Sequence, residues 1–82
     1  IKIYPNPTSN TSVIELENTS SHSKLSLSIF DVYGKQIYSS IQNLNYGLNQ
    51  IPIKDVSEFP SGIYFIHLQI GDETYSTKLI KL

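Results

Sequence analysis

Turn-forming residues interrupt this chain at short intervals, which leaves room only for short strands. Glycine, proline, asparagine and serine clusters recur roughly every 8–12 residues, with alternating apolar stretches between them. No stretch repeats its apolar residues at the helical period over a useful length. The pattern predicts an all-β fold, an Ig-like antiparallel β-sandwich of about seven short strands.

The last third of the sequence is typical of a β-hairpin. Residues 63–70 are rich in β-branched and aromatic side chains, which favour strands. Gly71 opens a turn, and residues 74–82 form the return strand. Ile63 and Phe65 add apolar bulk to the second face of the first strand, so we expect that strand to be covered on both sides near its start.

The other predicted elements are strands joined by specific turns. Asp31 and Gly34 occupy the first and fourth positions of a type I turn closed by a left-handed glycine. Asp55 is expected to cap a single helical turn over residues 55–59. The remaining strands are expected at residues 1–4, 12–17, 25–30, 35–44 and 48–53.

Two residues at the start of the hairpin have predicted structural roles. Tyr64 follows a corner near the start of the penultimate strand, where Ig-like sandwiches place a tyrosine whose hydroxyl bonds the backbone upstream. Gly62 is expected to occupy a left-handed or crowded backbone position.

Composition excludes several classes of function. The 82 residues include no cysteine, so disulfides and thiolate metal sites are excluded. Six basic residues, all lysine, and a net charge of −1 argue against nucleic-acid binding. The longest apolar run, residues 63–66, is too short to span a bilayer.

Few residues suit catalysis or metal binding. His22 and His67 have no spacing typical of a metal site, and the serines lack an evident base. Glu15 and Glu17 share a strand face, where a solvated role is favoured over a hydrolytic pair. Asp72 and Glu73 are a poor calcium cage. We expect no metal, no cofactor and no catalytic activity.

A sugar-binding platform of exposed aromatic rings is an alternative function. The absence of tryptophan weakens it. The tyrosines that remain as possible surface rings are Tyr4, Tyr33, Tyr38, Tyr46 and Tyr75.

Four motifs occur in a specific order along the chain, and together they carry a family resemblance. They are Ile3-Tyr4-Pro5-Asn6-Pro7, Ile29-Phe30-Asp31-Val32-Tyr33-Gly34-Lys35, Phe59-Pro60-Ser61-Gly62-Ile63-Tyr64 and Lys78-Leu79-Ile80-Lys81-Leu82. In this order they resemble the type A C-terminal sorting domain of the type IX (Por) secretion system of Bacteroidota, over the whole chain.

The resemblance implies a secretion signal rather than an enzyme. It implies an N-terminal cargo domain in the same chain, recognition by the outer-membrane translocon, and removal by a surface sortase-like peptidase. Cargo is then anchored to the cell surface or released. The residues to which it gives a recognition role are Pro5, Asn6, Pro7, Asp31, Gly34, Gly62, Tyr64, Gly71, Lys78, Leu79, Ile80, Lys81 and Leu82.

Two further expectations concern the ends of the sequence. Lys78 and Lys81 fall on opposite faces of the last strand, so we expect that strand to lie at an edge or to reach past the sandwich, with both charges accessible. The chain starts without methionine, so we interpret residues 1–82 as a single domain cut from a longer exported protein. The alternatives are an Ig- or fibronectin-like spacer or adhesion module and a carbohydrate-binding module.

Overall fold

Seven strands and one short 3-10 helix make up the fold, and the computed structural model describes all residues 1–82. The strands are β1 (Lys2–Tyr4), β2 (Ser12–Asn18), β3 (Lys24–Phe30), β4 (Gln36–Asn43), β5 (Gly47–Ile53), β6 (Gly62–Ile70) and β7 (Glu73–Lys81). The helix η1 (Val56–Glu58) lies between β5 and β6. Every predicted strand is confirmed, with boundaries that differ by one residue at most.

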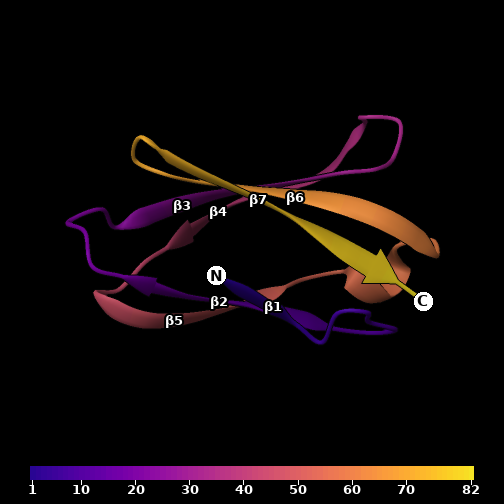
Figure 1. The fold of residues 1–82 in the computed structure, drawn as a ribbon, viewed down its shortest axis with the longest axis horizontal. Coiled ribbons are helices and arrows are strands. Elements are labelled where there is room, and N and C mark those ends of the chain that lie inside the picture. The colour runs from indigo at the N-terminus through magenta and orange to yellow at the C-terminus, as the bar shows by residue number, and fades with distance from the viewer.

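The strands form two antiparallel sheets that pack face to face (Figure 1). One sheet has the order β1-β2-β5 and the other the order β4-β3-β6-β7. In an Ig domain the first, second and fifth strands share one sheet, and the third, sixth and seventh share the other. This chain follows that arrangement, with β4 paired to β3. The predicted Ig-like sandwich is therefore confirmed.

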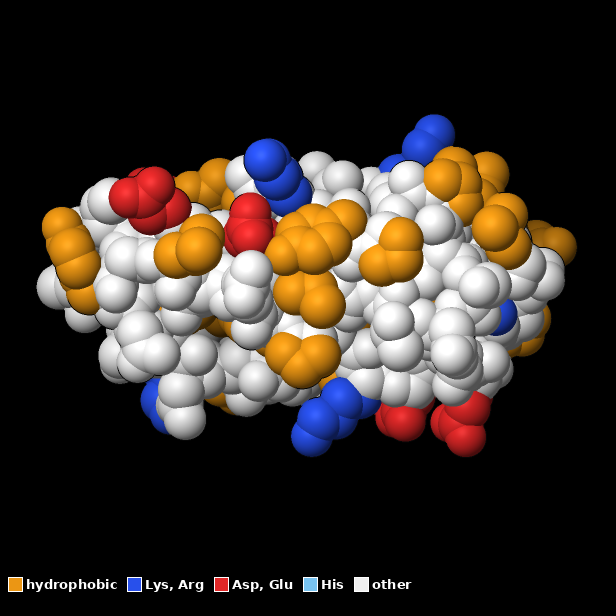
Figure 2. Space-filling model, turned by 90° about the horizontal axis from the view of Figure 1, so that it is seen from below, with side chains coloured by type: hydrophobic (Ala, Val, Ile, Leu, Met, Phe, Trp, Pro, Cys, Tyr) orange, Lys and Arg blue, Asp and Glu red, His pale blue; other side chains and the backbone are white.

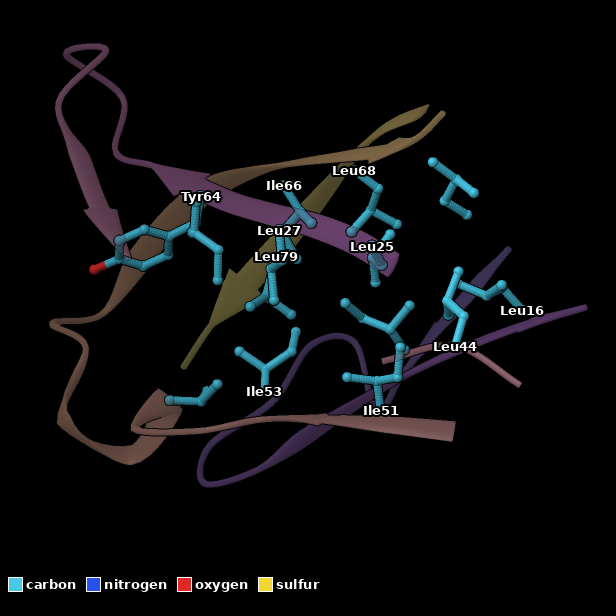
Figure 3. Packing of buried hydrophobic residues seen from close by; sticks show 14 residues of the cluster. Leu16, Leu25, Leu27, Leu44, Ile51, Ile53, Tyr64, Ile66, Leu68 and Leu79 are labelled. Carbon is cyan, nitrogen blue, oxygen red and sulfur yellow. The ribbon is translucent and has the colours of Figure 1, made fainter. Parts of the chain in front are cut away.

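A single hydrophobic core lies between the two sheets. Because strand side chains alternate, every second residue of β3 and β6 points inward, as Leu27 and Ile66 do. Ile51 and Ile53 meet them from β5 in the opposite sheet (Figure 3). The core cluster contains 14 buried hydrophobic residues. A two-layer fold of this kind has one interior and leaves both outer sheet faces uncovered.

The turn between β3 and β4 has the predicted geometry. The Gly34 N–H donates to the Asp31 carbonyl at 3.1 Å, and Gly34 has φ +82°. One Asp31 carboxylate oxygen accepts the N–H groups of Tyr33 and Lys35 at 2.9 and 3.0 Å. The side chain therefore closes the turn from inside, as expected of aspartate at the first turn position.

The predicted side-chain cap at Asp55 is wrong. The helical turn exists, but Asp55 has φ +65° and its side chain makes no capping hydrogen bond. A side-chain cap requires an extended backbone at the capping residue, which directs the carboxylate towards the first helical N–H groups. The left-handed backbone of Asp55 directs it elsewhere.

The prediction that β6 is covered on both sides near its start is also wrong. Ile63 and Phe65 are 41% and 47% exposed, because no element packs on the outer face of the four-stranded sheet. These two apolar residues instead form part of the molecular surface.

Candidate recognition surface

The four sequence motifs meet at one end of the sandwich. Residues 5–11, the turn 31–34, residues 59–61 and the end of β7 all lie at the right of Figure 1. Strand register contributes to this, because Phe30 pairs with Phe65, and Tyr64 pairs with Leu79. Segments far apart in the sequence therefore gather at one end of the sandwich.

Asn6 joins the first motif to the last. Its side-chain amide donates from Nδ2 to the Lys78 carbonyl at 2.8 Å. Its Oδ1 accepts the Ile80 N–H at 2.9 Å. A donor and an acceptor of one planar amide thus bond alternate residues along β7, as a peptide group of a neighbouring strand would do.

Thr8 extends this contact along the same edge. Its N–H donates to the Ile80 carbonyl and its carbonyl accepts the Leu82 N–H, both at 2.8 Å. Thr8 forms an isolated parallel bridge with Lys81 and is 2% exposed. Thr8 lies between the strands predicted at residues 1–4 and 12–17, and its contact with β7 was not predicted, since no local pattern points to a partner so distant in the sequence. We call the contact of Asn6 and Thr8 with β7 the edge clamp.

Pro5 and Pro7 flank Asn6, and both are preceded by cis peptide bonds. Neither proline has an N–H to donate. The Pro5 carbonyl accepts the Ser12 hydroxyl at 2.9 Å, which ties the loop back to β2. The loop therefore reaches β7 through the side-chain amide of Asn6 and the backbone of Thr8.

The Tyr64 side chain crosses from the core to the corner before β6. Its hydroxyl donates to the Pro60 carbonyl, four residues upstream, which confirms the predicted tyrosine corner. Burial, and secondly the negative charge of Asp31, raise the pKa of this hydroxyl above its usual value. The ring packs against Phe59 with centroids 5.2 Å apart. Tyr64 thus stabilises the corner between η1 and β6.

The second and third motifs line a common pocket of about 240 Å³. The turn contributes Asp31, Val32 and Tyr33, and residues 60–64 form the other wall. Val32 and Tyr33 are 57% and 91% exposed. This hairpin tip is a projecting apolar surface next to the tyrosine corner.

The fourth motif is divided between the core and the surface. β7 is an edge strand, as predicted. Leu79 is fully buried, whereas Lys78 and Leu82 are exposed. The expected accessibility of Lys81 is wrong, because Lys81 is only 8% exposed. Lys81 shares the inward face with Leu79, and its ammonium donates to the Leu82 carbonyl at 3.3 Å.

Gly62 begins β6 opposite Lys81, with φ +154°. A positive φ confirms that the backbone there is unusual. The predicted crowding is wrong, because no atom lies within 4 Å of the position that a β-carbon would occupy. The requirement for glycine is therefore one of backbone conformation alone.

Gly62→Val is expected to lower the free energy of unfolding by about 1–3 kcal/mol, because a β-branched residue must strain the backbone at this φ. Urea unfolding followed by circular dichroism measures the change. Ser61→Val, at the exposed neighbouring position, is the matched control and should lie close to wild type. Equal midpoints for the two variants would contradict the conformational argument.

Gly71 lies apart from the other residues that have an implied recognition role. It is at the tip of the β6–β7 hairpin, at the opposite end of the sandwich from the edge clamp. It has φ +58°, and an added β-carbon would lie 2.3 Å from the His22 ring. The structure accounts for Gly71 as a turn residue packed under a side chain, and it does not bring Gly71 to the shared surface.

Glu15 belongs to a hydrogen-bonded group on the outer face of the three-stranded sheet. Its carboxylate accepts the Tyr4 hydroxyl and the Gln50 amide, both at 3.0 Å. The hydrogen bond from Gln50, and secondly the one from Tyr4, lower the pKa of Glu15 below its usual value. A hydrolytic acid needs the opposite shift. Apolar side chains gather in the middle of this face (Figure 2). Tyr4, Val13 and Pro52 lie opposite one another across the three strands.

The remaining polar and aromatic candidates are scattered. Tyr33 is in the β3–β4 turn and Tyr46 in the turn before β5, at opposite ends of the sandwich. The close aromatic pair of the fold is Phe59 with Tyr64, in and beside the core. Tyr33 and Tyr46 therefore do not line up as a platform for a sugar. His67 contacts the Ser76 hydroxyl at 3.3 Å.

No group of three or more histidine, cysteine, aspartate or glutamate side chains is placed to hold a metal ion. No helix of the fold has the length and apolar character to cross a bilayer.

Two comparisons with known proteins are informative. Residues 2–82 match the family described as secretion system C-terminal sorting domain. Over 81 residues the chain is 33% identical to the ulvan lyase NLR42 of Nonlabens ulvanivorans. That alignment covers 98% of this chain and 14% of the lyase, so the chain spans about one seventh of the relative's length.

Proposed function

The chain belongs to the family of secretion system C-terminal sorting domains, the sorting signals of type IX secretion, and we propose that its own role is non-catalytic. In this proposal residues 1–82 form one domain that directs an attached cargo through the outer-membrane translocon. The observation that carries the proposal is the family match over residues 2–82.

Family membership implies interaction with the type IX secretion system and export to the cell surface or the medium. The proposal also covers recognition by the translocon, removal of the domain and the attached cargo. The translocon recognises the end of the sandwich where the motifs meet. A surface sortase-like peptidase removes the domain. The cargo is a separate domain of the same protein, as is compatible with a lyase relative that carries a similar segment in a much longer chain.

The geometry supports a role as a non-catalytic sorting signal. The sandwich has its own core of 14 buried residues and no group of three or more histidine, cysteine, aspartate or glutamate side chains placed to hold a metal. The recognition residues of the proposal are those of the edge clamp, the β3–β4 turn, the tyrosine corner and the end of β7. Buried motif residues such as Leu79 hold the surface in shape, and exposed ones such as Lys78 are available for contact.

A reporter fusion tests the proposal. A fluorescent protein with a Sec signal is fused to residues 1–82, to residues 1–77, or to neither, in a host with type IX secretion. The fusion to 1–82 is expected at the surface or in the medium. The fusion to 1–77 should be exported at least tenfold less, because it loses both the exposed Lys78 and the buried Leu79.

The reporter without the domain is the control, and it should remain in the periplasm. Retention of the complete fusion in the periplasm would contradict the proposed function. Equal export of the fusions to 1–82 and 1–77 would contradict a role for the end of β7.

A further inference from the structure

The outer edge of β7 is only partly occupied by the domain itself. The edge clamp bonds the Lys78 carbonyl, both backbone groups of Ile80 and the Leu82 N–H. In a strand, the N–H and C=O of one residue point to the same side, and those of the next residue point to the other. Even-numbered residues of β7 therefore face the outer edge. The backbone groups of Thr74 and Ser76 face it too, and no strand of the domain pairs with them there.

This open part of the edge, residues 73–78, is exposed throughout. All six side chains are exposed, on both faces of the strand, whereas Leu79 and Lys81 are buried. Exposed edges are usually protected by proline, bulges, inward charges or charged side chains on the edge, lysine above all. Residues 73–78 contain no proline and pair with β6 without a register shift, and their charged residues, Glu73 and Lys78, lie at the two ends of the segment. The edge is therefore available for a further strand.

A groove of about 550 Å³ lies on the outer sheet face beside this edge. Its apolar wall contains Phe30 and Phe65, which lie side by side in register, and Lys78 follows Phe65 in the same row. His67 and Ser76 form the next row. No acidic side chain lines the groove. Because Ser76 is small, the groove is open towards the edge.

These features specify the chemistry of an occupant. Unpaired backbone donors and acceptors at the spacing of a strand are matched by an extended peptide, which adds to a sheet through main-chain hydrogen bonds. An apolar side chain opposite Ser76 enters the groove at its Ser76 end, beside His67. A carboxylate near Lys78 balances a positive charge in a groove that contains no acid.

We propose that residues 73–78 are a docking site for an extended, acidic-apolar strand of a partner protein in the secretion apparatus, which pairs with the open edge of β7 and inserts an apolar side chain into the Phe30–Phe65 groove. The inference rests on the proposed function, because it supplies the contact by which a sorting domain is held during export. It places recognition on the open part of β7, next to the clamped end.

Ser76→Pro tests the main-chain pairing. Proline removes the outward N–H of Ser76, which the β6–β7 ladder does not use, so the fold should persist. Export of the reporter fused to residues 1–82 should fall at least tenfold. Ser76→Ala is the matched comparison, because it removes the hydroxyl that contacts His67 but keeps the N–H, and its export should exceed that of Ser76→Pro at least tenfold.

Thr74→Pro and Thr74→Ala form a second pair with the same expectation. If Ser76→Pro does not fold, export of the Thr74→Pro fusion tests the main-chain pairing instead. If neither proline variant folds, proline's fixed φ and its restriction of the preceding residue are sufficient causes, and the side-chain variants below decide. Folded proline variants that are exported like wild type overturn the proposal. Because the unchanged fusion is measured in parallel, failure of the proposed function is recognised separately as failure of that fusion.

Side-chain variants test the groove. Phe65→Ala should reduce export, whereas Ile41→Ala, an exposed apolar residue on the outer face of the same sheet, should not. Lys78→Glu should reduce export more than Lys24→Glu, a charge reversal on the same outer face. Equal export within each pair would overturn the groove contact.

Light scattering after size-exclusion chromatography tests a second copy as the occupant. The purified domain is expected to be monomeric. A dimer that Ser76→Pro dissociates would show that another copy of this chain occupies the edge, and it would overturn the proposed partner strand.

Discussion

Leu79→Ala is expected to lower the free energy of unfolding by about 3 kcal/mol, a large share of the roughly 5–10 kcal/mol typical of a small domain. Leu79 is fully buried opposite Tyr64, and its side chain points between the sheets (Figure 3). Truncation leaves a cavity that the surrounding core residues cannot close completely. Urea unfolding of the purified domain, followed by circular dichroism, measures the loss.

Lys78→Ala is the matched control, because it alters the preceding residue of the same motif on the exposed face. It should change the free energy of unfolding by less than about 0.5 kcal/mol. Similar losses for the two variants would contradict the division of this motif into a buried and an exposed half. The comparison also guides export experiments, since Leu79 variants act through folding.

Asn6→Ala is expected to lower the free energy of unfolding by about 2 kcal/mol, because it removes two hydrogen bonds of roughly 1 kcal/mol each. The Ile80 N–H loses its acceptor, and the Lys78 carbonyl loses its donor. Hydrogen exchange should show the effect most clearly at the Ile80 amide, whose exchange should accelerate at least tenfold.

Asn10→Ala is the matched control for this change. Asn10 lies in the same loop and is exposed, and only its backbone N–H takes part in a hydrogen bond, to the Thr8 hydroxyl. Exchange at Ile80 should be unchanged in this variant. An Ile80 amide that is equally protected in Asn6→Ala and wild type would show that the edge clamp does not hold β7.

Local chemistry in the sequence was sufficient to predict the strands and several turns. Alternating residues in 63–70, aspartate and glycine at positions 31 and 34, and a tyrosine after a corner each follow from short-range rules. The structure confirms each of them, and Tyr64 bonds Pro60 as expected. Short-range rules succeed here because the interactions themselves join residues close in the sequence.

The errors arose where the outcome depends on which surfaces a tertiary fold covers. Phe65 was expected in a core, yet a two-layer sandwich leaves it 47% exposed. Lys81 was expected at the surface, yet its place on the inward face leaves it 8% exposed. Asp55 was expected to cap η1, but its left-handed backbone prevents this. Periodicity assigns a residue to a face and does not say what covers that face.

The motifs of the candidate site could be predicted from the sequence, but their arrangement in space could not. The family resemblance placed Asn6 and residues 78–82 in the same set of motifs. The structure shows that the Asn6 side-chain amide bonds the backbone of Lys78 and Ile80. Thr8 was missed, because its bridge to Lys81 depends on the closure of both sheets. A contact between residues so distant in sequence has no local signature.

The edge clamp also fixes the order in which the domain can close. Asn6 and Lys78 are 72 residues apart, so their contact is among the most non-local of the fold. On a chain that emerges from its N-terminus, β1 to β5 can pair before residues 78–82 appear, whereas Asn6 and Thr8 have no partner on β7 until then. The clamp therefore cannot form before β7 is in place. A prematurely terminated chain therefore lacks the joined surface, and only a completely synthesised domain presents it.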